Sequence, residues 1–129
     1  MTDFGMEKRL DVGFDEALRR VPDALKAEGF GVLTEVDVQA TLKQKIDVDF
    51  RRYRILGACN PPFAHQALSE DIAVGLMMPC NVVVYEDDDE RAVVLAVDPR
   101  RTVAITGNPK LAELADTIAD KLRAALERM

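Results

Sequence analysis

The chain has 129 residues, of which 48% are hydrophobic and 31% are charged, and 23 acidic side chains outnumber 17 basic ones to give a net charge of −6. These values are typical of a globular protein, so we expect residues 1–129 to form a single domain around one core. The acidic excess provides no long-range attraction to phosphate groups. Nucleic acid and anionic membrane surfaces are therefore not expected as partners.

The amino-terminal residues and the two cysteines indicate the cellular compartment in which the protein is expected. No apolar stretch approaches the ~20 residues of a membrane-spanning helix, and the first seven residues lack the basic and apolar regions of a secretory signal. We therefore expect a cytoplasmic protein with no membrane partner. The two cysteines, Cys59 and Cys80, are too few for a disulfide framework and should be free thiols in that reducing compartment.

The first third of the chain predicts a strand, a helix and a second strand. Residues 4–10 form a weak strand pattern. A helical stripe then ends at Gly29, a residue suited to a left-handed cap, and comprises Phe14, Ala17, Leu18, Val21 and Leu25. Pro22 lies inside this stripe and predicts a kink or two shorter helices. Residues 30–36 read as a strand with Phe30, Val32 and Val36 on one face.

The middle of the chain predicts three further strands and two short helices. The helices are expected over residues 38–45 and 61–68. One strand covers residues 52–58, with Tyr53 and Ile55 on one face. Residues 81–85 and 92–97 flank the acidic segment 86–90, and this arrangement predicts an antiparallel hairpin with a solvated tip.

The last helix is the clearest element. Asn108 can cap its start and Pro109 fits the first helical position, ahead of a regular apolar stripe made by Leu111, Leu114, Ala115, Ile118, Leu122, Ala125 and Leu126. The predicted class is α+β, in the order strand, helix, four strands, helix, with a mostly antiparallel sheet and two main helices packed on one face. The two hairpin strands carry apolar residues on both faces, but the two main helices cover only one face of the sheet. Pairing with a second copy of the chain would cover the other face, so we predict a homodimer.

Two Cys-Asn pairs are the main candidate site. Cys59-Asn60 follows a predicted strand and precedes a helix, and Cys80-Asn81 begins the next strand. If these strands are antiparallel neighbours, both pairs lie at the same end of the sheet. Cys59, Asn60, Cys80 and Asn81 are therefore predicted to bind an unidentified small molecule.

Three interpretations of the cysteines remain open. The leading one is a binding module, whose occupant is a small ligand or a soft metal held with His65 or with Met77 and Met78. The second is a redox or sulfur-transfer enzyme in which Cys59 attacks, with Cys80 resolving or His65 as base. The third is an interaction domain with buried, inert thiols. No Cys-x-x-Cys pair is present, so no zinc or redox motif is indicated.

Cofactor motifs are missing from the sequence. The segment 86–90 lacks the alternating ligands and central glycine of an EF-hand loop. The seven glycines never assemble a phosphate-binding loop of the Walker or Rossmann type. We expect no cofactor.

Four segments resemble the family known as domain of unknown function 302, and they occur in the family's order: residues 29–37, 53–61, 79–86 and 98–99. The resemblance covers nearly the whole chain and includes both Cys-Asn pairs. It implies a small α+β fold with the element order given above and association as dimers, and it implies no activity. The chain departs from the family pattern at Met77 and Met78, where leucines are more usual, and at Pro22, where a helix former is expected.

Overall fold

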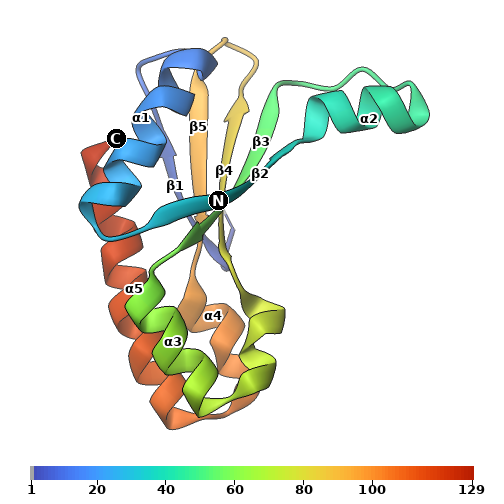
Figure 1. Ribbon diagram of the computed structural model, residues 1–129. Helices are drawn as coiled ribbons and strands as arrows, with labels where there is room; N and C mark the ends of the chain where they lie inside the picture. Colours follow the sequence, from blue (N-terminus) through green and yellow to red (C-terminus); the bar gives the residue numbers. More distant parts are fainter. Residues whose placement is uncertain (1) are drawn as a thin grey trace.

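The computed structural model describes residues 2–129, which form one five-stranded sheet with helices packed against it. In chain order the elements are β1 (Gly5–Arg9), α1 (Phe14–Ala27), β2 (Gly31–Asp37), α2 (Val38–Ile46), β3 (Tyr53–Cys59), α3 (Pro61–Glu70), the 3₁₀ helix η1 (Ile72–Met77), β4 (Cys80–Glu86), β5 (Ala92–Val97), α4 (Pro99–Val103), the 3₁₀ helix η2 (Ala104–Thr106) and α5 (Pro109–Arg128). The strand order is β1-β5-β4-β3-β2, and all neighbours are antiparallel (Figure 1). The predicted α+β class is confirmed.

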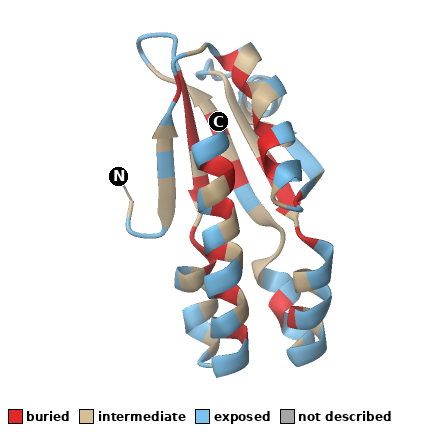
Figure 2. Ribbon diagram, turned by 90° about the vertical axis from the view of Figure 1, so that its left-hand side faces the viewer, coloured by how far each residue is buried: buried red, intermediate tan, exposed pale blue. Residues whose placement is uncertain are grey.

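The core lies between the sheet and the two long helices, α1 and α5. Alternate residues of a strand point to opposite faces, and the buried ones on the three central strands include Leu56, Ala58, Val82, Val84 and Val94. They meet buried stripes on α1 and α5, and the stripe on α5 is visible in Figure 2. We call this the inner face of the sheet. The prediction of two main helices on one face is confirmed.

Helix α1 is not divided at Pro22, so the predicted alternative of two shorter helices is wrong. It runs unbroken through 14 residues, and Pro22 stands inside it. A proline in a helix interior costs about 3 kcal/mol, whereas each fully buried aliphatic or aromatic side chain contributes roughly 1.5–3 kcal/mol. Phe14, Val21 and Leu25 are all buried on the core side, so packing outweighs the missing hydrogen bond. Gly29 follows the helix with φ +88°, as the cap prediction required.

Strand β2 contradicts the prediction that Val32 and Val36 share a face. A bulge shifts the register between Val32 and Thr34. Val32 therefore pairs with Ala58 on the inner face, whereas Val36 pairs with Ile55 on the other face. Periodicity cannot reveal an inserted residue of this kind.

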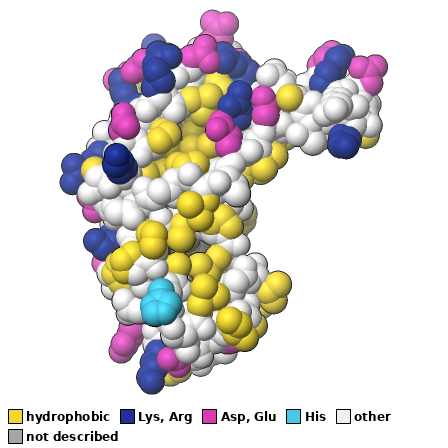
Figure 3. Space-filling view, in the orientation of Figure 1, with side chains coloured by type: hydrophobic (Ala, Val, Ile, Leu, Met, Phe, Trp, Pro, Cys, Tyr) yellow, Lys and Arg dark blue, Asp and Glu magenta, His cyan; other side chains and the backbone are white. Residues whose placement is uncertain are grey.

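Helix α2 stands away from the rest of the protein. It follows β2 and projects from the body of the molecule in Figures 1 and 3. None of its residues is buried. Within the described residues, Ile46, Val48 and Phe50 are exposed apolar side chains in or just after this helix.

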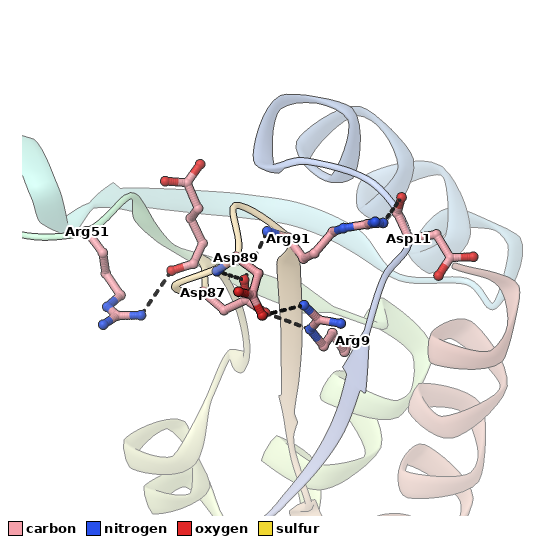
Figure 4. A network of polar contacts seen from close by, with 7 residues as sticks. Arg9, Asp11, Arg51, Asp87, Asp89 and Arg91 are labelled. Carbon is pink, nitrogen blue, oxygen red and sulfur yellow. Dashed lines mark hydrogen bonds and ion pairs between the residues drawn. The ribbon is translucent and has the colours of Figure 1, made fainter.

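The acidic tip of the β4–β5 hairpin is held by arginines (Figure 4). Arg9 of β1 donates from Nε to Asp87 Oδ2 at 2.6 Å, and Arg51 donates to the carbonyl oxygen of Glu86 at 3.1 Å. The other carboxylate oxygen of Asp87 accepts the backbone N–H groups of Asp89 and Arg91. The hairpin is confirmed, and its carboxylates serve ion pairs and the turn.

Candidate functional site

A cavity forms because α5 extends beyond the sheet. This helix has 20 residues and is therefore about 30 Å long, whereas the six residues of β5 span only about 20 Å. The amino-terminal half of α5 consequently has no strand beneath it. Instead, α3, η1 and α4 surround it at the lower end of the molecule in Figure 1.

We call the space enclosed there the sheet-end cavity, and its volume is about 260 Å³. In Figure 3 hydrophobic side chains gather over this end of the molecule. None of the lining residues is charged, and they are Phe30, Leu33, Ala58, Cys59, Asn60, Phe63, Ala64, Ala67, Val74, Met77, Met78, Pro79, Cys80, Val97, Pro99, Thr102, Val103, Leu111, Leu114, Ala115 and Ile118. Such a lining favours apolar ligands.

Both cysteines border the sheet-end cavity. Ala58 pairs with Cys80 in the last register position of the β3–β4 ladder, so Cys59 is one residue beyond it. Strand alternation directs Ala58 and Cys59 to opposite sides. Both cysteines are nevertheless among the residues that line the cavity. Both are free thiols.

The two thiols differ in environment. Cys80 packs against the core, and burial raises the pKa of its thiol to about 11, with a smaller contribution from nearby Cys59. Since the thiolate is the nucleophilic form, this raised pKa lowers the reactivity of the Cys80 thiol near neutral pH. This environment disfavours the version of the enzyme hypothesis in which Cys59 attacks and Cys80 resolves the disulfide.

Of the two predicted asparagines, only Asn60 lines the sheet-end cavity. Its side chain does not cap α3 as expected. Instead, Asn60 Nδ2 donates to the carbonyl oxygen of Glu28 at 3.3 Å and joins the start of α3 to the end of α1. Asn81 is exposed and pairs with Gly57 on the outer face, the sheet face opposite α1 and α5.

The remaining polar candidate, His65, is exposed on α3 and is not among the residues that line the cavity. Three other residues of α3 line the cavity instead, namely Phe63, Ala64 and Ala67. Residues 2–129 also contain no group of three His, Cys, Asp or Glu side chains placed to hold a metal ion. The structure therefore brings together Cys59, Asn60 and Cys80, and leaves Asn81 and His65 apart from them.

Most of the cavity wall was not foreseen from the sequence. Leu111, Leu114 and Ile118 belong to a stripe that was interpreted as core, and α4 was not predicted. Asp98-Pro99 repeats the cap pattern of Asn108-Pro109: Asp98 Oδ1 accepts the backbone N–H of Arg100 at 3.1 Å, as Asn108 does for Lys110. That repeated pattern was the available signal for α4.

Comparison with known proteins gives a family and a structural relative. A sequence model described as "Domain of unknown function DUF302" matches residues 6–129. A crystal structure of an uncharacterized conserved DUF302 protein from Bacillus stearothermophilus is similar, with 34% sequence identity, 98% of each chain covered and a TM-score of 0.91. A search of curated proteins finds no match. Among the described residues, no helix is both long and apolar enough to cross a membrane.

Proposed function

The chain belongs to the DUF302 family, which has no assigned function, and from its geometry we propose a binding module that holds a small, largely apolar ligand in the sheet-end cavity. The observation that carries the proposal is a cavity of about 260 Å³ with no charged residue in its wall. An apolar cavity of roughly 150 Å³ is enough to bind benzene. This one has room for a larger molecule.

The polar groups of the wall fit an uncharged ligand. The Thr102 hydroxyl donates a hydrogen bond to the carbonyl oxygen of Pro99 at 3.2 Å, and the Asn60 side-chain nitrogen donates one to the carbonyl oxygen of Glu28. The Cys59 and Cys80 thiols are weak hydrogen-bonding groups. An ionised ligand would lose its hydration without gaining a charged partner. Two free thiols are compatible with a reducing compartment, so the proposal keeps the cytoplasm as the location.

Binding of the uncharged fluorescent probe phenylnaphthylamine tests the proposed function. Wild-type protein should bind it in a saturable manner. Ala64→Leu fills part of the cavity from α3 and should weaken binding by at least about tenfold, or 1.4 kcal/mol. Ala27→Leu adds the same volume at an exposed position and should leave binding unchanged. No saturable binding to wild type, or equal binding by both variants, would exclude the proposal.

We further propose that the module is a homodimer joined through the outer face. Every position on that face of β3, β4 and β5 is uncharged: Tyr53, Ile55, Gly57, Cys59, Asn81, Val83, Tyr85, Val93, Leu95 and Val97. Two copies that each carry a net charge of −6 repel each other at long range, which favours contact through an uncharged patch. A symmetric contact uses the same patch twice, and an apolar sheet face suits it.

Light scattering after size-exclusion chromatography tests the dimer. Wild type should have twice the chain mass of 14.3 kDa. Val83→Lys places a charge at the centre of the outer face and should give a folded monomer. Ile105→Lys, at an exposed position of η2, should remain dimeric. A monomeric wild type at micromolar concentration would refute this assembly.

A further inference from the structure

Helix α2 and the segment that returns from it to β3 form an exposed arm, which we define as residues 38–50. Gln39 Nε2 donates to the carbonyl oxygen of Phe50 at 3.0 Å and joins the two ends of the arm. Lys43 forms an ion pair with Asp49 at 3.1 Å. The helix and the returning segment are therefore held side by side, so the arm presents a defined surface.

The arm lacks the packing that stabilises a short helix. An isolated helix of fewer than ~12–15 residues is marginal in water, and most helical stability in proteins comes from packing of an apolar face. Helix α2 has nine residues, and none of them is buried. Val38, Leu42 and Ile46 recur every four positions and so lie along one side. Ile46 is 63% exposed, and Val48 and Phe50 after it are 41% and 43% exposed. A surface outside the protomer is needed to cover this apolar side.

The arm continues the outer face of the sheet. Val36 of β2 pairs with Ile55 on that face and is two residues ahead of the arm. At the other end of the arm, the Phe50 ring lies 6.1 Å from the ring of Tyr53, which stacks on Tyr85 at 5.9 Å. In Figure 1 helix α2 projects to the right, whereas α1 and α5 lie on the left. A partner placed on the outer face therefore meets the arm as well.

The uncharged part of the outer face is small for a stable dimer. Strands β3, β4 and β5 have seven, seven and six residues. With neighbouring strands about 4.8 Å apart and about 3.4 Å per residue, they measure roughly 350 Å² in plan. A standard interface buries about 800 Å² on each partner. The dimer therefore needs an adjoining surface, and the arm is an exposed apolar surface that adjoins this face.

The charge of the arm suits a second copy of the chain. Residues 38–50 contain two lysines and two aspartates and so have no net charge, which leaves the whole −6 on the rest of the chain. The arm can approach an acidic copy without the long-range repulsion that opposes contact through charged surfaces.

We propose that the arm of each protomer packs against the partner chain that lies on the outer face, through the side of α2 that carries Val38, Leu42 and Ile46 and through the Val48 and Phe50 side chains. This inference rests on the proposed homodimer and adds the element that completes its contact. Because a two-fold contact is reciprocal, each copy both supplies an arm and receives one.

Sedimentation of a dilution series tests the arm by giving the dissociation constant of the dimer. Ile46→Lys places a charge in the apolar side of α2 and should raise this constant at least about tenfold. Gln44→Lys adds the same charge on the opposite side of the helix, at an exposed position, and should leave it unchanged. Equal constants for wild type and Ile46→Lys, or equal effects of the two variants, would overturn the inference.

Hydrogen exchange tests whether the partner stabilises α2. The backbone N–H of Asp47 donates to the carbonyl oxygen of Lys43 at the end of the helix. This amide should exchange at least about tenfold more slowly in the wild-type dimer than in protein diluted well below the dissociation constant. Amides in the middle of α5 should exchange equally in both samples. Equal exchange of the Asp47 amide in the two samples would contradict the proposed contact.

The variants separate this inference from the proposed function. If wild type is a dimer that Val83→Lys dissociates and Ile46→Lys does not, the arm inference fails and the outer-face dimer stands. If Ile46→Lys dissociates the dimer and Val83→Lys does not, the outer-face contact fails and the arm contact stands. A monomeric wild type would refute both. The binding of phenylnaphthylamine reports on the sheet-end cavity alone.

Discussion

Gly29 follows α1 and Gly31 begins β2, two residues later, yet the two glycines are under different constraints. Gly29 has φ +88°, and a Cβ atom added there would lie 3.1 Å from Asn60 Nδ2. Gly31 has open space around the equivalent position. Gly29→Ala should therefore lower the free energy of unfolding by about 1–2 kcal/mol, whereas Gly31→Ala should be neutral or slightly stabilising. Urea denaturation measures both, and equal effects would show that the left-handed backbone is unimportant.

Cys80 gives a second prediction at the residue scale. With a pKa of about 11, its thiolate fraction at pH 8 is roughly 100-fold below that of a free thiol. In the Cys59→Ser variant, where Cys80 is the only thiol, alkylation by iodoacetamide should be slower than in the urea-unfolded chain by at least that factor. The unfolded chain is the internal control for reagent and variant. A native labelling profile with its midpoint near pH 8.5 would contradict the buried environment.

At the scale of elements, the cap of α5 is the most direct link between sequence and structure. Asn108 Oδ1 accepts the backbone N–H groups of Lys110 at 2.9 Å and Leu111 at 3.3 Å. Asn108→Ala should cost about 1 kcal/mol and lower Tm by about 4 °C. Asn108→Asp retains an acceptor and should restore most of the loss. Calorimetry measures both, and equal loss in the two variants would mean that the side-chain oxygen is not the stabilising group.

The strands and helices were predictable wherever a local pattern determined them. Asn108-Pro109, the alternation of Tyr53 and Ile55 and the two hairpin strands were each identified correctly, because capping and burial act over a few residues. The sequence misled where a distant partner decides the outcome. Pro22 is tolerated because α1 is held by the core, and the bulge of β2 depends on its pairing with β3. Asn60 does not cap α3, and its side-chain nitrogen instead donates to the carbonyl oxygen of Glu28, just after α1.

At the scale of the whole molecule, the candidate site was only half predictable. Pairing of neighbouring antiparallel strands was enough to place Cys59 and Cys80 at one end of the sheet, as the structure does. The cavity itself arises from a mismatch between the length of α5 and that of the strands. A hydrophobic stripe has the same pattern whether it covers a sheet or encloses a space, so Leu111 and Ile118 carried no separate signal.

The last prediction concerns the ion pair between Arg9 of β1 and Asp87 at the tip of the β4–β5 hairpin. Arg9 hydrogen-bonds to Asp87 and holds the pKa of that carboxyl group below its usual value near 3.8. A lowered carboxyl pKa stabilises the folded state above the unfolded pKa, and this contribution is lost as pH falls through the folded pKa. Arg9→Gln should therefore be less stable than wild type at pH 5–7, and the difference should shrink below about pH 3.8.

Arg123→Gln is the control for Arg9→Gln. It removes the same charge from an exposed position of α5, so general electrostatic effects of the −6 chain appear equally in both variants. Urea denaturation of the three proteins across pH 2.5–7 isolates the contribution of the Arg9–Asp87 pair. A stability difference between the two variants that stays constant through this range would show that Asp87 does not titrate abnormally. Arg9 would then stabilise the edge strand β1 only through the packing of its side chain.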